Sequence, residues 1–279
     1  MPHTAQISRS NPTALVFLLD QSASMLEPFG RQPDKRKADG VADALNRLLQ
    51  NLVLKCAKAD GIRDFFHVAM LSYGGRVASA FGGALAGRNL VPISQVANNP
   101  LRVEVRTRKV DDGVGGVIDE QVKFPVWFEA RPTGRTPMCA ALRMAKEYVQ
   151  AFLGVQPNCY PPIVINITDG HPSDGDPRTA AKELRELASK DGNVLLFNAH
   201  LSEKENQPIE FPDNEAGLPD NYAKLLFRMS SELPAKLVDA AKSAGFAVGP
   251  KSRGFVFNAD LVAVIRFLDI GTRVAQSVR

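Results

Sequence analysis

The sequence predicts an α/β fold: an open, mostly parallel β-sheet with helices on both faces. Short apolar runs alternate with longer segments in which apolar residues recur every three or four positions, as expected for strands alternating with amphipathic helices. Of the 279 residues, 44% are hydrophobic, which is enough for a large core. We therefore expect one domain over residues 1–279, with a β-hairpin insertion at about 76–131.

The first predicted strand is the continuous apolar run from Thr13 to Leu19, which is typical of a strand buried on both faces. A long helix follows, with Asp34 as its candidate cap. Its apolar face is formed by residues at helical spacing: Ala38, Val41, Ala42, Leu45, Leu48, Leu49 and Leu52. The run from Phe65 to Tyr73 predicts a second strand, ended by Gly74-Gly75.

The insertion breaks this alternation of strands and helices. Val103 and Val105 alternate with charged residues, and a second run over residues 118–128 alternates in the same way. Residues 111–116, Asp-Asp-Gly-Val-Gly-Gly, lie between the two runs and form a strong turn signal. We expect an antiparallel hairpin at the edge of the sheet. Its basic residues are more typical of a solvated strand than of a binding surface.

The alternation resumes after the insertion. The expected elements are a helix over 137–153, a strand from Ile163 to Thr168, a helix opened by Asp176-Pro177, a strand over 193–200, a helix over 233–244, a short strand over 255–257 and a helix from about 260. The polar, proline-containing stretch over 202–221 predicts a long loop.

Composition excludes several classes of function. The 34 basic residues exceed the 30 acidic ones by only four, without the clustering that nucleic-acid binding needs. The longest apolar run has six residues, too few to span a bilayer, and the polar residues 1–12 do not resemble a secretory signal. The three widely spaced cysteines, Cys56, Cys139 and Cys159, predict buried thiols in a reducing cytoplasm.

Oxygen-bearing side chains follow two of the predicted strands. Asp20, Ser22 and Ser24 come after the first strand, and Asp169 comes after the strand that ends at Thr168. The carboxyl ends of parallel strands meet at one edge of a sheet, so these residues are expected to converge there. Thr136 precedes the next helix as a candidate cap and adds a third hydroxyl. Two carboxylates and three hydroxyls suit Mg²⁺, Mn²⁺ or Ca²⁺, and the absence of His and Cys argues against zinc.

This pattern closely resembles the metal-ion-dependent adhesion site of von Willebrand factor A domains. The match consists of Asp20-x-Ser22-x-Ser24, Thr136 in Gly-Arg-Thr-Pro, and Asp169 in Thr-Asp-Gly. The resemblance covers most of the chain and implies a Rossmann-like sheet. It implies one divalent cation, Mg²⁺ above all, held by the three hydroxyls, with the two carboxylates coordinating directly or through water. The long segment before Thr136 departs from the family.

The resemblance also implies a function. Neutral hydroxyls leave a bound metal with appreciable positive charge and one open coordination position. An Asp or Glu of a protein partner can fill that position. Intracellular bacterial members of the family often occur beside kinases, phosphatases, ATPases or stress-resistance factors. We therefore expect a metal-dependent protein-binding module, a cytoplasmic scaffold or regulatory subunit rather than an enzyme.

Two enzyme classes stay open as alternatives. A Mg²⁺-dependent phosphohydrolase can use an Asp after a first strand as nucleophile, but the haloacid-dehalogenase pattern requires a second Asp where Ser22 stands and a catalytic lysine that cannot be placed. A Ser-His-Asp hydrolase lacks its GxSxG elbow. Gly74-Gly75 is a weak phosphate-loop signal without a Walker lysine.

The other polar residues near the predicted edge have simpler interpretations. His171 is expected in a solvated loop, His67 within the sheet, and His200 at a strand end, where it could line the rim of the site. Asp174 and Asp176 are expected to be loop and cap residues that add negative charge near the metal.

Overall fold

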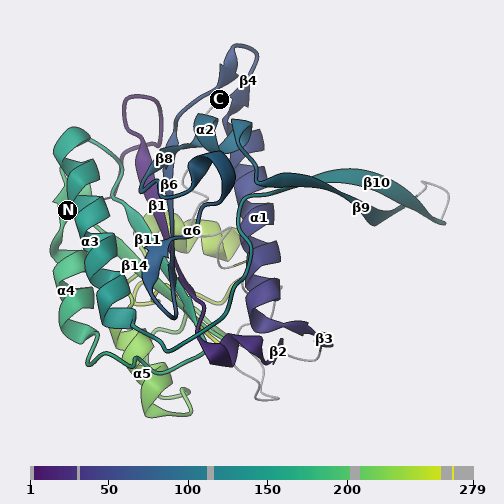
Figure 1. Cartoon of the computed structure of the whole chain (residues 1–279). Coiled ribbons are helices and arrows are strands. Elements are labelled where there is room, and N and C mark those ends of the chain that lie inside the picture. Colours follow the sequence, from purple (N-terminus) through teal and green to yellow (C-terminus); the bar gives the residue numbers. More distant parts are fainter. Residues whose placement is uncertain (1–2, 30–31, 112–115, 202–207, 259–265, 267–279) are drawn as a thin grey trace.

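The computed structural model describes residues 3–29, 32–111, 116–201, 208–258 and 266 (Figure 1). Its centre is an eight-stranded sheet in the order β15-β16-β14-β11-β1-β6-β7, with β8 paired to β6. The strands are β1 Thr13–Asp20, β6 Phe66–Tyr73, β7 Val77–Ser79, β8 Val91–Pro92, β11 Ile163–Thr168, β14 Leu195–His200, β15 Ile209–Glu210 and β16 Phe255–Phe257. Strands β1, β6, β11, β14 and β16 are parallel, whereas β7, β8 and β15 pair antiparallel at the edges. The predicted open, mostly parallel sheet is confirmed.

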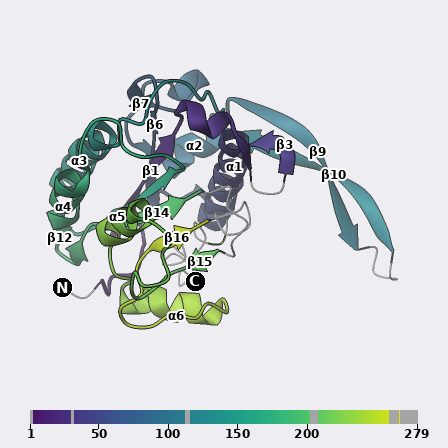
Figure 2. The same cartoon turned by 90° about the horizontal axis from the view of Figure 1, so that it is seen from below.

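Helices cover both faces of this sheet, as predicted. They are α1 Lys37–Cys56, α2 Ile93–Asn98, α3 Met138–Val155, α4 Arg178–Glu186, α5 Asn221–Met229 and α6 Ala235–Ser243, with 3₁₀ turns η1 Ala23–Leu26 and η2 Gly83–Leu85. Seen from below, α3, α4 and α5 lie on one side of the sheet, with α1 and α6 on the other (Figure 2). Two separate hydrophobic clusters fill the layers between sheet and helices.

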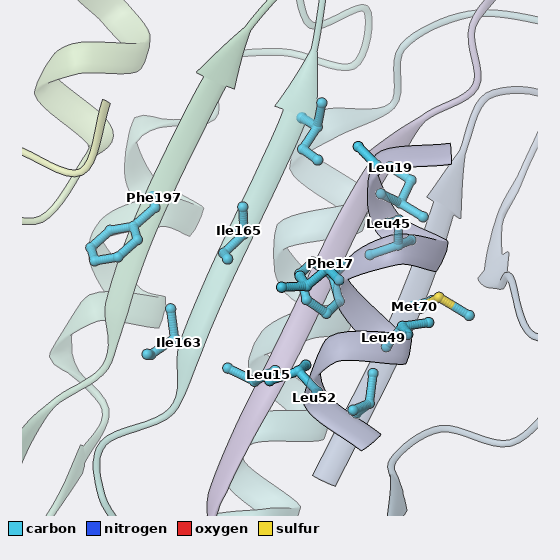
Figure 3. Close-up of a cluster of buried hydrophobic side chains, with 14 of the residues drawn as sticks. Leu15, Phe17, Leu19, Leu45, Leu49, Leu52, Met70, Ile163, Ile165 and Phe197 are labelled. Atoms are coloured by element: carbon cyan, nitrogen blue, oxygen red, sulfur yellow. The ribbon is translucent and has the colours of Figure 1, made fainter. Parts of the chain in front are cut away.

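Alternation along β1 explains the two clusters. Leu15, Phe17 and Leu19 face α1 and pack among Leu45 and Leu49 (Figure 3). The intervening side chains of β1 point to the opposite layer, where they meet α3. Every residue of β1 is buried, so the unbroken apolar run of the sequence reflects burial on both faces.

In the described part of the chain, four two-stranded hairpins lie outside the main sheet. They are β2 Pro28–Phe29 with β3 Gln32–Arg36, β4 Ala57–Lys58 with β5 Gly61–Ile62, β9 Arg102–Asp111 with β10 Val117–Val126, and β12 Ala188–Ser189 with β13 Gly192–Asn193. The predicted hairpin of the insertion is β9–β10, antiparallel as expected. It forms a sheet of its own rather than extending the main one, and it projects away from the body beside α1 (Figures 1 and 2).

Asn46 of α1 holds the base of this hairpin. Its Oδ1 accepts hydrogen bonds from the backbone N–H groups of Trp127 (2.8 Å) and Phe128 (3.1 Å), and its Nδ2 donates to the Phe128 carbonyl (2.9 Å). Further out, the guanidinium of Arg106 lies 3.6 Å from the ring centroid of Phe124. Among the described residues, β9 and β10 pair with each other and not with the main sheet, and the hairpin contacts the body through α1.

Several helix and strand boundaries differ from the predictions. Asp34 lies within β3, and the N-cap position of α1 is Arg36 rather than Asp34, so the helix begins at Lys37. Asp176 accepts a hydrogen bond from the backbone N–H of Arg178, but Pro177 is the N-cap, so α4 starts one residue later than expected. The strand predicted from residue 193 begins at Leu195, because Gly192–Asn193 forms a turn hairpin instead.

Three predicted features lie wholly or partly outside the described residues. The central turn of the insertion includes 112–115, the long loop includes 202–207, and the helix predicted from about 260 falls on residues of which only 266 is described. Within the described part of the chain, no helix is long and apolar enough to cross a bilayer.

All three cysteines are buried, as predicted. Burial raises the pKa of the Cys56 thiol to about 12 and those of Cys139 and Cys159 to about 11. The reactive thiolate form is therefore scarce at neutral pH, and the three side chains serve as small core residues.

The sheet order creates a switch point at β1. The chain passes from β1 to β6 on one side and later returns to β11 on the other side of β1. In open α/β sheets, the crevice beyond the carboxyl ends of such strands is where ligands bind. In this chain those ends carry Asp20, Tyr73 and Thr168.

Candidate metal centre

The structure brings the five predicted site residues to this one edge of the sheet. Asp20 is the last residue of β1, and Ser22 and Ser24 lie at the 3₁₀ turn that follows. Asp169 follows β11, and Thr136 lies two residues before α3. Residues more than a hundred positions apart in the sequence therefore lie together at the strand ends, as predicted.

Asp20 is fully buried, and each of its carboxylate oxygens accepts a hydrogen bond. Oδ1 accepts from the backbone N–H of Ser22 at 2.8 Å, and Oδ2 accepts from the hydroxyl of Thr168 at 2.6 Å. Burial raises the pKa of Asp20 from 3.8 to about 6, although these hydrogen bonds oppose the shift. A bound cation would favour the charged form of this carboxylate.

The two serines and Asp169 form a short chain of hydrogen bonds. The hydroxyl oxygens of Ser22 and Ser24 lie 3.0 Å apart, and the Ser24 hydroxyl donates to Asp169 Oδ1 at 2.7 Å. Two ligands at neighbouring corners of an octahedral Mg²⁺ shell, with bonds of about 2.0–2.1 Å, lie about 3 Å apart. The serine pair therefore already has the spacing of neighbouring ligands.

The space beside Gly170 shows how three of the oxygens surround one point. A Cβ atom placed on Gly170 would lie 3.2 Å from Thr136 Oγ1, 3.5 Å from Ser24 Oγ and 3.8 Å from Asp20 Oδ2. Glycine leaves this point free, and the three nearest heavy atoms outside residues 169–171 are these oxygens. The set fits a hard divalent cation, because carboxylate and hydroxyl oxygens are the ligands such ions prefer.

Carboxylates alone do not form this site. Among the described residues, no group of three or more His, Cys, Asp or Glu side chains is placed to hold a metal. The candidate centre therefore depends on its three hydroxyls, which are neutral and leave the charge of a divalent ion to be compensated by Asp20 and Asp169.

Gln21 locks the loop of the two serines to the segment before Thr136, a role that sequence analysis missed. Its backbone carbonyl accepts from the Thr133 N–H at 2.6 Å, and its side-chain Oε1 accepts from the Arg131 N–H at 2.6 Å.

The loop after β6 packs against the same two segments. A Cβ on Gly74 would lie 2.3 Å from the Gln21 carbonyl oxygen and 2.6 Å from that of Thr133. Close backbone packing therefore requires glycine at position 74. This packing accounts for Gly74 without a phosphate-binding role.

Ser173 and Asp174 connect Thr136 to the loop after β11. The Thr136 N–H donates to Ser173 Oγ at 3.1 Å, and the Ser173 N–H donates to the Thr136 carbonyl at 2.9 Å. The Asp174 carboxylate accepts from the N–H groups of Cys139 (3.0 Å) and Ala140 (2.8 Å) at the start of α3. Asp174, from another loop, therefore caps α3 in the role predicted for Thr136. A local sequence rule could not find it, because the cap comes from 35 residues away.

Lys37, the first residue of α1, also reaches the site. Its ammonium donates to Asp169 Oδ2 at 2.9 Å and to Glu27 Oε2 at 2.7 Å. The Lys37 side chain is only 4% exposed, and that of Asp169 only 2%. Sequence analysis missed this residue, since a lysine at a helix start carries no motif.

The histidines near this edge pack against aromatic rings. His200 is 7% exposed and stacks on Phe257, with ring centroids 5.0 Å apart and planes 5° apart. His171 is exposed and lies against Tyr222 at 4.2 Å. His67 lies within β6, as predicted.

The raised pKa of Asp20 predicts an unusual pH dependence for the metal-free protein. The folded state binds a proton at Asp20 more tightly than the unfolded chain does, so the free energy of unfolding should rise as pH falls from about 8 through 6 towards 4. The contribution of Asp20 is at most about 3 kcal/mol. Thermal melts in chelator across this range measure it. Asp20→Asn should flatten the slope, and equal slopes in both proteins would contradict the assignment.

Comparison with known proteins adds likenesses of fold. No family model matches the sequence, and no curated protein matches it. The manganese-loaded TRAP protein of Plasmodium vivax is 17% identical, covering 93% of this chain and 72% of that chain, with a TM-score of 0.43. The minor pilin PilB of Streptococcus sanguinis is 11% identical, covering 100% of this chain and 64% of that chain, with a TM-score of 0.48.

A third similar structure is the ArnB paralog VWA2 of Sulfolobus acidocaldarius. It is 12% identical, covering 71% of this chain and 36% of that chain, with a TM-score of 0.36. This chain therefore spans less than two thirds of the length of both PilB and VWA2. At these identities and TM-scores the likenesses carry no argument about function, which rests on the residues of this chain.

Proposed function

We propose that this chain is a metal-dependent protein-binding module with a metal-ion-dependent adhesion site of the von Willebrand factor A type. The supporting observation is the oxygen-lined space beside Gly170, at the switch point of the sheet. Ser22, Ser24 and Thr136 would hold the cation, Mg²⁺ by preference, with Mn²⁺ or Ca²⁺ as substitutes. Asp20 and Asp169 would supply negative charge directly or through water.

The chain's own residues explain how such a site would bind a partner. Hydroxyl ligands are neutral, so the bound cation keeps part of its charge and attracts an Asp or Glu of the partner. Asp20 and Asp169 are already fixed by hydrogen bonds from Thr168 and Ser24, so little ordering is needed on binding. The proposal includes a cytoplasmic role as scaffold or regulatory subunit, where the three buried thiols stay reduced.

A phosphohydrolase is less well supported by this geometry. Its nucleophile would be Asp20, whose side chain is buried and whose two oxygens both accept hydrogen bonds. Ser22 occupies the position where the haloacid-dehalogenase pattern needs an acid. A phosphatase panel run with Mg²⁺ checks this alternative, and turnover abolished by Asp20→Asn would favour it over the binding module.

Calorimetric titration of Mg²⁺ and Mn²⁺ tests the metal site. Asp20→Ala should weaken binding by at least about tenfold, because the remaining ligands compensate the charge of the ion less well. Asp60→Ala is a matched control, since Asp60 is 61% exposed and pairs with Arg63 at the surface. Equal affinities for wild type and Asp20→Ala would overturn the proposal.

Capture from native lysate tests the partner. A protein retained by wild type with Mg²⁺ should be lost on chelation and with Asp20→Ala, but retained by Asp60→Ala. Partners that are retained equally by all forms, with and without chelator, would contradict binding through the metal.

A further inference from the structure

Lys37 is placed where neither its helix nor solvent stabilises its charge. It is the first residue of α1, at the positive end of the helix dipole, where a cation is disfavoured. Its side chain is 4% exposed, so little water solvates the ammonium. The carboxylates of Asp169 and Glu27 offset this cost, at 2.9 and 2.7 Å. Both acids therefore contribute to stabilising the buried ammonium.

These contacts fix Asp169 and neutralise its charge. Oδ1 accepts from the Ser24 hydroxyl, and Oδ2 accepts from the Lys37 ammonium. Both partners of the Lys37–Asp169 pair are buried, so the pair is weakly screened by solvent. A cation beside Gly170 would therefore experience the full charge of Asp20, but only a small net charge from Asp169 together with Lys37.

Glu27 shares the ammonium unequally with Asp169. The Glu27 side chain is 52% exposed, whereas that of Asp169 is 2% exposed. Water and salt screen the exposed contact much more than the buried one. The backbone also fixes the arrangement, because the Lys37 N–H donates to the Glu27 carbonyl at 2.9 Å. Lys37 is thus held beside Glu27 by its main chain and at Asp169 by its side chain.

We propose that Lys37 is a positioning residue that sets the residual charge of the metal site. By neutralising Asp169 it weakens the affinity for the cation itself, and it leaves a bound cation with more uncompensated charge for an acidic partner. This inference rests on the proposed metal-binding function. It predicts that loss of the ammonium tightens metal binding, whereas damage to a purely structural residue would weaken it or leave it unchanged.

The test is calorimetric titration of Mg²⁺ and Mn²⁺ alone into four proteins: wild type, Lys37→Gln, Lys37→Met and Lys37→Arg. Lys37→Gln keeps a hydrogen-bond donor for Asp169 without the charge, so it serves even where Lys37→Met fails to fold. Both neutral variants should bind the cations about tenfold more tightly than wild type, and Lys37→Arg should bind them like wild type. Lys35→Met is the matched control, since Lys35 is 26% exposed and pairs with Asp43, which is not one of the proposed ligands.

Melting curves provide a second readout. Without metal, the neutral variants should melt below wild type, because the charge of Asp169 loses its buried partner. Added Mg²⁺ should raise their midpoints more than that of wild type.

If wild type binds metal and folded Lys37→Gln binds it no more tightly, the proposed role of Lys37 is wrong while the proposed metal site stands. If no variant binds metal, the proposed function fails and this inference fails with it.

Discussion

Gly170→Ala is expected to weaken binding of Mg²⁺ and Mn²⁺ by about a hundredfold without removing any ligand. The new methyl group would lie 3.2 Å from Thr136 Oγ1 and 3.5 Å from Ser24 Oγ, at the point that these oxygens surround. The backbone of Gly170 lies outside the positive-φ region, so alanine can adopt its conformation. The free energy of unfolding of the metal-free protein should therefore change by no more than about 1 kcal/mol.

Calorimetry and thermal melts together check this variant. Gly217→Ala is its matched control, because a Cβ there meets no atom within 4 Å and lies far from the site in sequence. The control should bind both ions like wild type. Unchanged metal affinity in a folded Gly170→Ala would mean that no cation occupies the space beside Gly170, and the ligand set would have to be abandoned.

Gly74→Ala should cause a large loss of stability through a single added methyl group. Its Cβ would lie 2.3 Å from the Gln21 carbonyl oxygen and 2.6 Å from that of Thr133. Both are backbone atoms that cannot rotate away, and both belong to the loops that carry Ser22 and Thr136. We expect the free energy of unfolding to fall by about 3 kcal/mol or more, which lowers the melting temperature by about 10 °C.

Gly75→Ala provides the comparison for this effect. Its Cβ would meet only Thr133 Cγ2 at 3.4 Å, an ordinary contact. Urea denaturation should therefore show a near-wild-type midpoint for Gly75→Ala and a strongly lowered one for Gly74→Ala. Similar midpoints for the two variants would show that the three loops do not pack as closely as described.

The sheet was predictable because its strands are buried on both faces. The apolar runs that end at Asp20 and Thr168 become β1 and β11, and the short run over 255–257 becomes β16 with the predicted bounds. Burial on both faces forces a continuous apolar pattern, which few other structures share. Switching of the chain at β1 then brings distant strand ends together.

Helix starts and the hairpin's surroundings were harder to predict. Asp34 resembles a cap, yet β3 continues to Arg36, and the cap of α3 comes from Asp174 on a distant loop. The alternation of apolar and polar residues in β9 and β10 predicts a hairpin, but it does not predict which element the hairpin packs against. The connection to α1 is made by polar residues of that helix, among them Asn46, Asp43 and Gln50. Such long-range pairings have no local signal in one sequence.

Among the residues of the candidate site, the five proposed oxygen ligands stood out by residue type and spacing. The residues that hold these five in place did not stand out. Gln21, Gly74 and Lys37 act through backbone contacts, close packing and a buried ion pair, each with a partner remote in sequence. These are the residues on which the precision of the site depends, so the structure was needed to find them.

The position of a bound cation is tested most directly by anomalous scattering of Mn²⁺ in crystals of the wild-type protein soaked in that ion. We predict an anomalous peak at the carboxyl end of β1, among the hydroxyl oxygens of Ser22, Ser24 and Thr136 and beside Gly170. Crystals of Gly170→Ala soaked in the same way should lack this peak. A manganese peak elsewhere in wild type, or no peak at this position, would contradict the assignment of the metal centre.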